Sequence, residues 1–449
     1  MRRRSTSNRG RVRRRVRASR LTLLVAGAGL MVGMPTFLAA TSATAGASST
    51  FRATLGFPAG QTVTVAPGTQ GALQDAFVLR DGYLYGSSEQ ASGAWTAWTE
   101  LSSGQLEDVP LTWVPGTDGL VQELLGISGT RLVADAQLAT GDWTTWTTLG
   151  APSLTGVAPE PPVYAPATAH STQHVFVMGN TGHVYMGSQT GDTVAWTTAP
   201  VGGTGVTFTS TYGGRVTYAP GSNGSTEELF AFDEPNQEYV TWDSDGTWHT
   251  WVRFGAPELD TYAQGVTYGP GSNGSLQEMF GVIYGAQGYV PAVSWEAADG
   301  EWSTWESYGP TPGDSDFDTS RLAVAPGSNG SLQEIFAVAT DTAEVYVDWE
   351  SPSGAWSGWE SMGPGDFRYW TTTDTPTTGA AYFPQRLHIV TYAPGSNGSL
   401  QEIFATSGTY TETVPGYEIM VNWENPGGTW SGWRSMGAAR GPEECSPDC

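Results

Sequence analysis

The sequence contains no lysine, and all 20 of its basic residues are arginine. Ten of them lie within the first twenty positions, and the first 45 residues contain no acid. The remainder of the chain therefore carries 10 Arg against 44 Asp and Glu, a net charge of −34. This balance argues against a nucleic-acid binder, because neutralising phosphates requires clustered Lys and Arg. It also argues against a polybasic protein of the membrane surface.

Charged residues make up only 14% of the chain, whereas aromatic residues reach 12% and include 19 Trp. Disordered chains have far fewer aromatic side chains. Cysteine is scarce as well, since the only two, Cys445 and Cys449, lie in the last eleven residues, a tail at 439–449. In an exported protein they can form a disulfide, which would fix only this tail. No histidine lies near them, so they do not indicate a metal site.

The N-terminus has the pattern of an export signal. Residues 1–20 are rich in arginine, and 21–40 form an apolar run interrupted by glycine and proline. Ala43-Thr44-Ala45 then offers the small residues of a signal-peptidase site, so residues 1–45 are interpreted as a signal peptide. An uncleaved anchor is the alternative, because about twenty apolar residues can span a bilayer. After cleavage, we expect a secreted protein with no stable membrane insertion.

An internal repeat indicates the architecture. Four segments are nearly identical: Val216–Ser225, Val266–Ser275, Leu322–Ser331 and Val390–Ser399. Three divergent copies precede them, and each of the seven has one equivalent proline: Pro67, Pro115, Pro166, Pro220, Pro270, Pro326 and Pro394. Every copy ends in Trp-x-x-Trp except the third, which keeps only Trp196. A register shared by seven copies cannot arise by chance.

Each copy has the pattern of four short strands. The first closes with an Asn-Gly turn in the last four copies, a strong hairpin signal. The second carries Gln, an acid and Phe, the third ends in Trp in those same copies, and the fourth is expected to carry Trp-x-x-Trp. No segment after the signal region has helical periodicity. Repeats of about 40–50 residues with four strands each predict a β-propeller.

We therefore predict an all-β protein, a seven-bladed β-propeller with four antiparallel strands per blade, over residues 57–438. The blades are expected at 57–104, 105–152, 153–205, 206–257, 258–311, 312–365 and 366–438. The last copy is longer because of an insertion at 365–385, which includes Arg368 and Trp370.

Two segments give the repeat a family resemblance: Gly330-Ser-Leu-Gln-Glu-Ile-Phe336 and Trp349-Glu-Ser-Pro-Ser-Gly-Ala-Trp-Ser-Gly-Trp-Glu-Ser-Met-Gly363. They resemble the Trp-rich repeat of PLL-type seven-bladed bacterial lectins, and the resemblance extends over all seven copies. It implies a single-chain propeller with sugar sites between blades, often for fucose or related, sometimes methylated, sugars. Copies one and three depart most from the pattern, and we expect their sites to be lost.

Sugar binding also has a physical basis, because a pyranose presents an apolar face and a rim of hydroxyls. Its site needs an aromatic plane beside polar groups. The candidate planes are the third-strand residues Trp242, Trp295, Trp349 and Trp423 and the first Trp of each ending, Trp248, Trp302, Trp356 and Trp430. Packing between blades is the alternative role for each. Within Trp-x-x-Trp, the two rings are expected on opposite faces of an extended strand.

Six acids share one position in the repeat: Asp75, Glu123, Glu228, Glu278, Glu334 and Glu402. A glycosidase needs one unique pair of carboxylates about 5–10 Å apart. Six equivalent acids instead suggest a repeated hydrogen bond to backbone or indole N–H, or one sugar-hydroxyl acceptor per site. The Asn-Gly-Ser motifs match glycosylation sequons, although turn chemistry explains them. The five histidines lack metal-ligand spacing, and neither a metal nor a cofactor is expected.

These observations predict a secreted, non-enzymatic lectin with several similar sites between blades. Its expected partners are glycans on cell surfaces or polysaccharides, because linked weak sites bind such surfaces well. One alternative is a propeller glycosidase or lyase that uses non-repeated acids: Asp233, Glu234, Asp314, Asp316 and Asp318. The other is a secreted protein-interaction scaffold in which Arg368 and Trp370 contact a partner.

Overall fold

The computed structural model describes the residues from 63 to 436 except 81, 103–105, 107–109, 118, 153–155, 157–159, 167–172, 191–192, 209–215, 234–236, 255–265, 286–287, 309–316, 318–321, 340–343, 364–389 and 412–413. The chain divides into two units, residues 1–51 and 52–449, and every described residue belongs to the second. Several predictions fall outside the described residues: the signal peptide, the cysteine pair, the insertion at 365–385, and Glu234, Asp314, Asp316 and Asp318.

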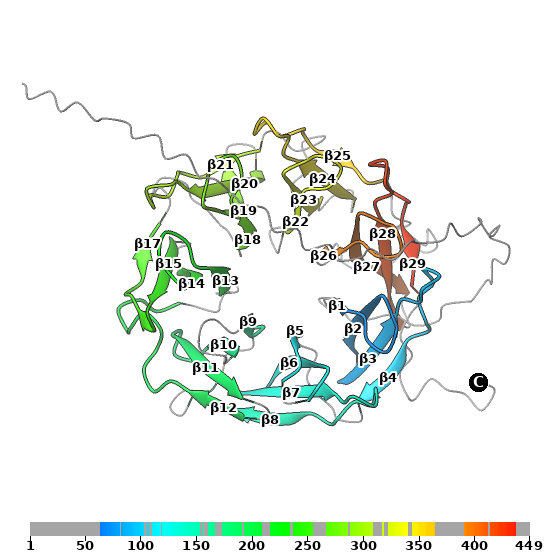
Figure 1. Ribbon diagram of the computed structural model, residues 1–449, viewed down its shortest axis with the longest axis horizontal. Coiled ribbons are helices and arrows are strands. Elements are labelled where there is room, and N and C mark those ends of the chain that lie inside the picture. Colours follow the sequence, from blue (N-terminus) through cyan, green and yellow to red (C-terminus); the bar gives the residue numbers. More distant parts are fainter. Residues whose placement is uncertain are drawn as a thin grey trace, which may run out of the picture. The chain divides into compact units, whose positions relative to one another are not determined.

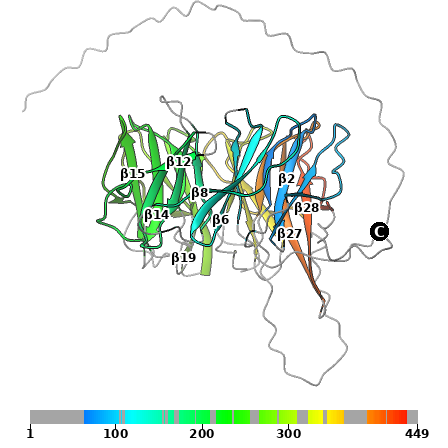
Figure 2. The same cartoon turned by 90° about the horizontal axis from the view of Figure 1, so that it is seen from below.

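Seven antiparallel sheets form a ring, which confirms the predicted seven-bladed β-propeller (Figure 1). Each sheet uses the strands of one repeat in chain order, from the centre of the ring outwards. Blades 1 to 7 are β1–β4, β5–β8, β9–β12, β13–β17, β18–β21, β22–β25 and β26–β29. Figure 2 shows strands such as β2 and β14 running from one face of the ring towards the other. The described part of the chain contains no helix.

The strands occupy equivalent positions in every blade. The first strands are β1 (Thr64–Pro67), β5 (Thr112–Pro115), β9 (Val163–Ala165), β13 (Thr217–Pro220), β18 (Val266–Pro270), β22 (Ala323–Pro326) and β26 (Thr391–Pro394). The second strands are β2 (Gln74–Arg80), β6 (Gln122–Ser128), β10 (Gln173–Met178), β14 (Glu227–Asp233), β19 (Gln277–Gly285), β23 (Gln333–Val338) and β27 (Gln401–Thr411).

The third strands are β3 (Tyr83–Ser88), β7 (Arg131–Gln137), β11 (Val184–Thr190), β15 (Gln237–Ser244), β20 (Gly288–Glu296), β24 (Val345–Trp349) and β28 (Val414–Trp423). The outermost strands are β4 (Thr99–Ser102), β8 (Thr147–Gly150), β12 (Thr193–Trp196), β21 (Glu306–Ser307), β25 (Glu360–Ser361) and β29 (Arg434–Ser435). In blade 4 the outermost position is occupied by two short strands, β16 (Thr247–Trp248) and β17 (Val252–Arg253), and both pair with β15.

In the described part of the chain each sheet is built from one repeat, so the blades exchange no strand where the ring closes. Neighbouring first strands contact one another all the way round, and β1 contacts both β5 and β26. A threonine hydroxyl joins many of these pairs by donating to a carbonyl of the next first strand or the residue just before it. Thr64 donates to Leu111 at 2.9 Å, and Thr391 of blade 7 donates to Val63 at 3.1 Å. The last bond connects the two ends of the ring.

The Asn-Gly turns have the conformation that the sequence predicts. Asn223 has φ 44° and Gly224 has φ 94°, and the equivalent pairs in blades 5, 6 and 7 match them. Positive φ at both central residues is the hairpin geometry that Asn-Gly favours. The tight turn brings the second strand directly back beside the first.

We expected the Trp-x-x-Trp pair to lie in the fourth strand. The structure shows that it does not. In blade 6 the first indole residue, Trp356, makes one bridge to Glu350, and the regular strand β25 begins only after Trp359. Between them, the Ser357 hydroxyl accepts from the Trp349 amide at 3.2 Å and donates to Asp348 at 2.7 Å. The Ser357 backbone N–H still donates to the Trp349 carbonyl at 3.0 Å, so the hydroxyl takes over only the acceptor half of this ladder position.

The hydrophobic core consists of seven clusters, one at each interface between neighbouring blades. The cluster between blades 4 and 5 joins Phe230 and Val240 of one blade to Met279 and Ala292 of the other. Phe230 is fully buried, and burial of such a side chain stabilises the fold by about 1.5–3 kcal/mol. The interfaces between blades therefore hold the fold together and also carry the candidate sites.

Candidate functional site

The first Trp of each ending reaches back to the preceding blade. Trp302 of blade 5 meets Phe230 of blade 4 edge-to-face, with ring centroids 5.4 Å apart. Equivalent contacts, at 5.2–6.2 Å, join Trp95 to Phe404, Trp143 to Phe77, Trp248 to Phe176, Trp356 to Phe280 and Trp430 to Phe336. Such aromatic pairs add about 0.5–1.5 kcal/mol beyond the burial of their area. These indoles therefore pack between blades, yet each remains half-buried.

Both indoles of a pair face the same interface, so the expectation of opposite faces is wrong. Trp302 and Trp305 both pack in the cluster between blades 4 and 5. Trp356 and Trp359 likewise share the cluster between blades 5 and 6. The physical reason is the break in the strand described above, since alternation of faces holds only where the backbone stays extended.

The third-strand indoles of blades 5, 6 and 7 face the following blade. Trp295 pairs with Glu278 across the ladder and packs in the cluster between blades 5 and 6, where Trp356 also lies. Trp349 lies with Trp430 in the next cluster. All eight candidate indoles are half-buried. In blades 5 and 6 the third-strand Trp therefore shares its interface with the first Trp of the next copy, whereas the two candidates of one copy face different interfaces.

Two consequences were not visible from the repeat alone. Trp423 of blade 7 shares its cluster with Trp95 of blade 1, which the sequence did not single out. Trp248 packs at the interface of blades 3 and 4, where Ser188 takes the place of a third-strand Trp. Trp95 holds the same repeat position as the other first tryptophans, so the repeat gave a signal for it once the ring was known to close.

A polar network accompanies the indoles at each of three successive interfaces. Between blades 4 and 5, Glu228 accepts from the backbone amide and the hydroxyl of Ser222, both at 3.0 Å. Its other oxygen accepts from the Gln277 amide, which also donates to Glu296 at 2.9 Å. Glu278 with Gln333 and Glu334 with Gln401 repeat the bond between an acid and the glutamine of the next blade. The repeated acid thus binds backbone and joins blades.

Burial raises the pKa of the four carboxyls that end or directly follow the third strands: Glu89, Glu296, Glu350 and Glu424. The facing repeated acid of the preceding blade raises each pKa further, while hydrogen bonds from serine oppose the shift. For Glu296 the facing acid is Glu228 and the serine is Ser222. When two carboxyl groups lie close enough to share one amide donor, the repulsion between their charges favours protonation of one of them.

Blades 3 and 4 are joined by an equivalent contact in which the acid belongs to the following blade instead of the preceding one. Blade 3 has His174 in the acid position, and blade 4 has Glu227 in the glutamine position. The His174 Nδ1 lies 3.0 Å from a carboxylate oxygen of Glu227, which is buried. The acceptor has moved from one side of the interface to the other, so the bond between blades is kept.

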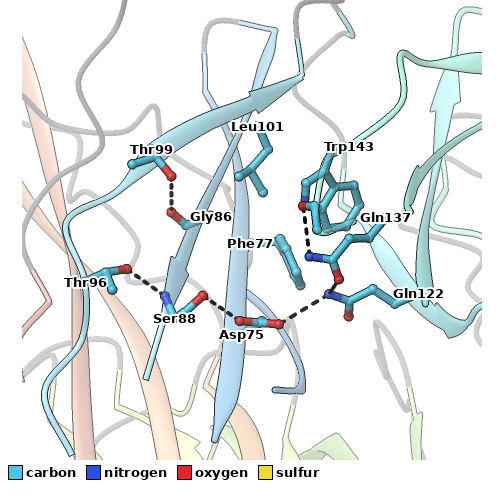
Figure 3. Close-up of a pocket in the computed structure, with 11 residues that line it drawn as sticks. Asp75, Phe77, Gly86, Ser88, Thr96, Thr99, Leu101, Gln122, Gln137 and Trp143 are labelled. Atoms are coloured by element: carbon cyan, nitrogen blue, oxygen red, sulfur yellow. Dashed lines mark hydrogen bonds between the residues drawn. The ribbon is translucent and has the colours of Figure 1, made fainter. Parts of the chain in front are cut away.

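A cavity of about 180 Å³ lies between blades 1 and 2 (Figure 3). Ser88 stands opposite Asp75 in the ladder, the register at which later blades place Trp opposite Glu. The space beside this small side chain is left open, whereas Trp295 packs into the equivalent cluster between blades 5 and 6. The cavity is lined by Asp75, Phe77, Gly86, Ser88, Thr96, Thr99, Leu101, Gln122, Gln137, Gly141 and Trp143.

The lining combines one apolar wall with one polar wall. Trp143 and Phe77 meet with ring centroids 5.2 Å apart and planes at 67°. Ser88 donates to Asp75 at 2.6 Å, and the Gln122 amide donates to the Gln137 carbonyl oxygen at 3.0 Å, with Gln137 on the same side as Trp143 (Figure 3). A cavity of about 150 Å³ accommodates one benzene ring. This cavity therefore has room for a single six-membered ring between an indole and hydrogen-bonding groups.

The cavity lies in a copy whose site we expected to be lost. Copy one has Ser88 where later copies have the third-strand Trp, and the cavity lies beside this small side chain. Among the described residues, no three His, Cys, Asp or Glu side chains are grouped to hold a metal ion. That part of the chain also has no helix long and apolar enough to cross a membrane.

Comparison with known proteins supports the fold. The BP39L lectin from Burkholderia pseudomallei is similar over 84% of this chain and 99% of its own, with a TM-score of 0.61 and 17% identity. At this identity the likeness shows a shared propeller architecture. A scan against protein-family models and a search of curated proteins find no match.

More distant propellers include a lectin and an enzyme. A mutant of the Aleuria aurantia lectin, solved with α-methyl-L-fucoside, matches 69% of this chain and 97% of its own, at 13% identity and a TM-score of 0.41. A mutant puromycin hydrolase matches 82% of this chain and 52% of its own, at 14% identity and a TM-score of 0.47.

Proposed function

We propose that this protein is a secreted lectin that binds carbohydrate at the interfaces between blades and does not cleave it. The observation that carries the proposal is the cavity between blades 1 and 2. It places Trp143 beside the hydroxyl of Ser88 and the amides of Gln122 and Gln137. A pyranose ring requires this combination of an aromatic plane and convergent polar groups. Secretion rests on the N-terminal pattern of the sequence.

The repeated interfaces support several sites in one molecule. Blades 5, 6 and 7 each present a half-buried third-strand indole, and the neighbouring blade adds the first Trp of its ending. Single sites of this kind are expected to bind weakly, at about micromolar to millimolar Kd. Several sites on one rigid ring raise the effective concentration towards a glycan-coated surface, so binding to multivalent glycans becomes much stronger.

The state of the acids favours binding over catalysis. Asp75, the carboxylate of the cavity, accepts from Ser88, from Gln122, and from both the amide and the hydroxyl of Thr69. Its oxygens are therefore occupied by the protein itself. A glycosidase instead needs one acid and one base or nucleophile free to act on the scissile bond.

A glycan array tests the proposal. Fucose and its methylated derivatives are the first ligands to include, because the repeat resembles that of PLL-type lectins. The expected result is binding to multivalent glycans that weakens when Trp143→Ala removes the apolar wall of the cavity. A folded protein that binds no glycan on the array would overturn the proposal. Turnover of a polysaccharide, abolished by one acid substitution, would favour the enzyme instead.

A further inference from the structure

One indole of the ring already holds a cation. The guanidinium carbon of Arg434 lies 4.4 Å from the ring centroid of Trp423, over its face. Arg434 begins β29 and pairs with Val421, two residues before Trp423 on the same face of blade 7. The molecule therefore shows, within itself, that the face of a third-strand indole accepts a positive group.

Blades 5 and 6 have a carboxylate in the place of this arginine. Glu306 pairs with Val293, two residues before Trp295, and Glu360 pairs with Val347, two residues before Trp349. This register equals that of Arg434 with Val421, so each glutamate lies on the same face as its indole. In blade 1 the same position belongs to Thr99, which lines the cavity. Both glutamates are exposed.

Within the described residues, the faces of Trp295 and Trp349 carry no stacked ring or guanidinium, unlike the other two third-strand indoles. Trp242 of blade 4 is covered by His249, with ring centroids 4.7 Å apart and planes at 20°. Trp423 is covered by Arg434. Blades 5 and 6 thus offer an indole face with an adjacent anion, and blades 4 and 7 offer an indole face that the protein covers itself.

We propose that Trp295 with Glu306, and Trp349 with Glu360, bind the protonated amino group of amino sugars. This inference rests on the proposed function and assigns the ligand class of two of its sites. The ammonium group lies over the indole as Arg434 does over Trp423, and the glutamate supplies the opposite charge.

Charge favours this ligand class over neutral and acidic glycans. The chain carries a formal charge of −24, and its negative field raises the rate at which cationic ligands arrive. An N-acetylated sugar has lost its positive charge, so it forms neither the cation–π contact with the indole nor the charge pair with the carboxylate. An anionic glycan is repelled by Glu306 and Glu360.

The test is calorimetric titration of the whole chain with oligomers of glucosamine and with N-acetylglucosamine oligomers of equal length. We expect the free amines to bind more tightly, with an advantage that shrinks as salt is added. The double variant Glu306→Gln, Glu360→Gln should weaken glucosamine binding about two- to tenfold and leave N-acetylglucosamine binding unchanged. Arg434→Glu should uncover Trp423 and add one glucosamine site.

Several results would overturn the inference. If the N-acetylated oligomers bind as tightly as the free amines, the amino group is not recognised. If oligolysine of matched charge binds these two sites as well as glucosamine does, they are general cation sites. If neutral glycans bind elsewhere on the ring while glucosamine does not bind at all, this assignment fails and the lectin proposal stands. If no carbohydrate binds, the lectin proposal itself fails.

Discussion

Ser88 donates a 2.6 Å hydrogen bond to Asp75 at the ladder position where blades 4 to 7 pair a tryptophan with a glutamate. A cavity lies beside Ser88, between blades 1 and 2. In blades 5, 6 and 7 an indole at the same ladder position packs against the following blade. These three interfaces therefore serve as controls for the interface that holds the cavity.

Ser88→Trp is expected to fill the cavity and remove one sugar site. The reason is that Trp295, Trp349 and Trp423 occupy the equivalent position without disturbing their blades. Calorimetric titration with a monosaccharide that binds the native protein should show about one site fewer, and thermal unfolding should show a folded protein. Ser88→Ala is the matched control, because it keeps the cavity open. An unchanged number of sites in Ser88→Trp would contradict this prediction.

Trp302 and Trp295 lie in the same blade but are expected to respond differently to truncation. Trp302→Ala removes contacts with Phe230 and Phe254, so the free energy of unfolding should fall by about 2–4 kcal/mol. Trp295→Ala should cost less stability and should weaken ligand binding between blades 5 and 6. Urea denaturation and titration measure the two effects. The reverse order, with Trp295 the greater loss of stability, would show that its indole serves packing.

Alanine substitutions at Gly300 and Gly246 separate two destabilising effects, which are backbone strain and a steric collision. Both have positive φ, at 84° and 81°, which costs about 1–2 kcal/mol when alanine is introduced. A Cβ on Gly300 would also collide with the amide of Asn223 from the preceding blade, whereas one on Gly246 meets no described atom within 4 Å. Gly300→Ala should therefore destabilise more than Gly246→Ala. Adding Asn223→Gly should remove the difference, and its persistence would argue against this contact between blades.

Stability should depend on pH through the carboxyl groups between blades. Burial raises the pKa of Glu296 above its ordinary value of 4.5, so the folded chain keeps a proton that the unfolded chain has lost. The contribution of this group to the free energy of unfolding therefore falls as pH rises from about 4.5 through the folded pKa. Glu296→Gln keeps the shape and cannot titrate. Its stability relative to the native protein should rise across this pH window, and a constant or falling difference would contradict the assignment.

The fold follows from features that the sequence states directly. Seven copies in one register predict seven blades, and Asn-Gly after each of the last four first strands predicts their hairpins. The prediction for Trp-x-x-Trp is wrong, because at positions such as Ser357 a serine hydroxyl, and not a backbone carbonyl, accepts from the third strand. A side chain that takes over one ladder bond leaves no mark in the alternation of apolar residues.

The sites depend on contacts between copies, which the repeat does not specify. Trp423 shares a cluster with Trp95, more than 300 positions away, only because blade 7 meets blade 1. The exchange of His174 and Glu227 across one interface is equally invisible within a single copy. The cavity lies beside Ser88, at a position where copy one departs from the Trp of later copies. Departure from the motif predicts a lost site, so the sequence points away from this interface.

A crystal soaked in mixed monosaccharides tests most directly whether carbohydrate binds between the blades. The predicted result is a sugar ring against Trp143, within hydrogen-bond distance of Ser88 or Gln137, with further rings at the half-buried indoles of blades 5 and 6. Density for sugar at no interface, or only on surfaces away from every indole, would contradict the proposal.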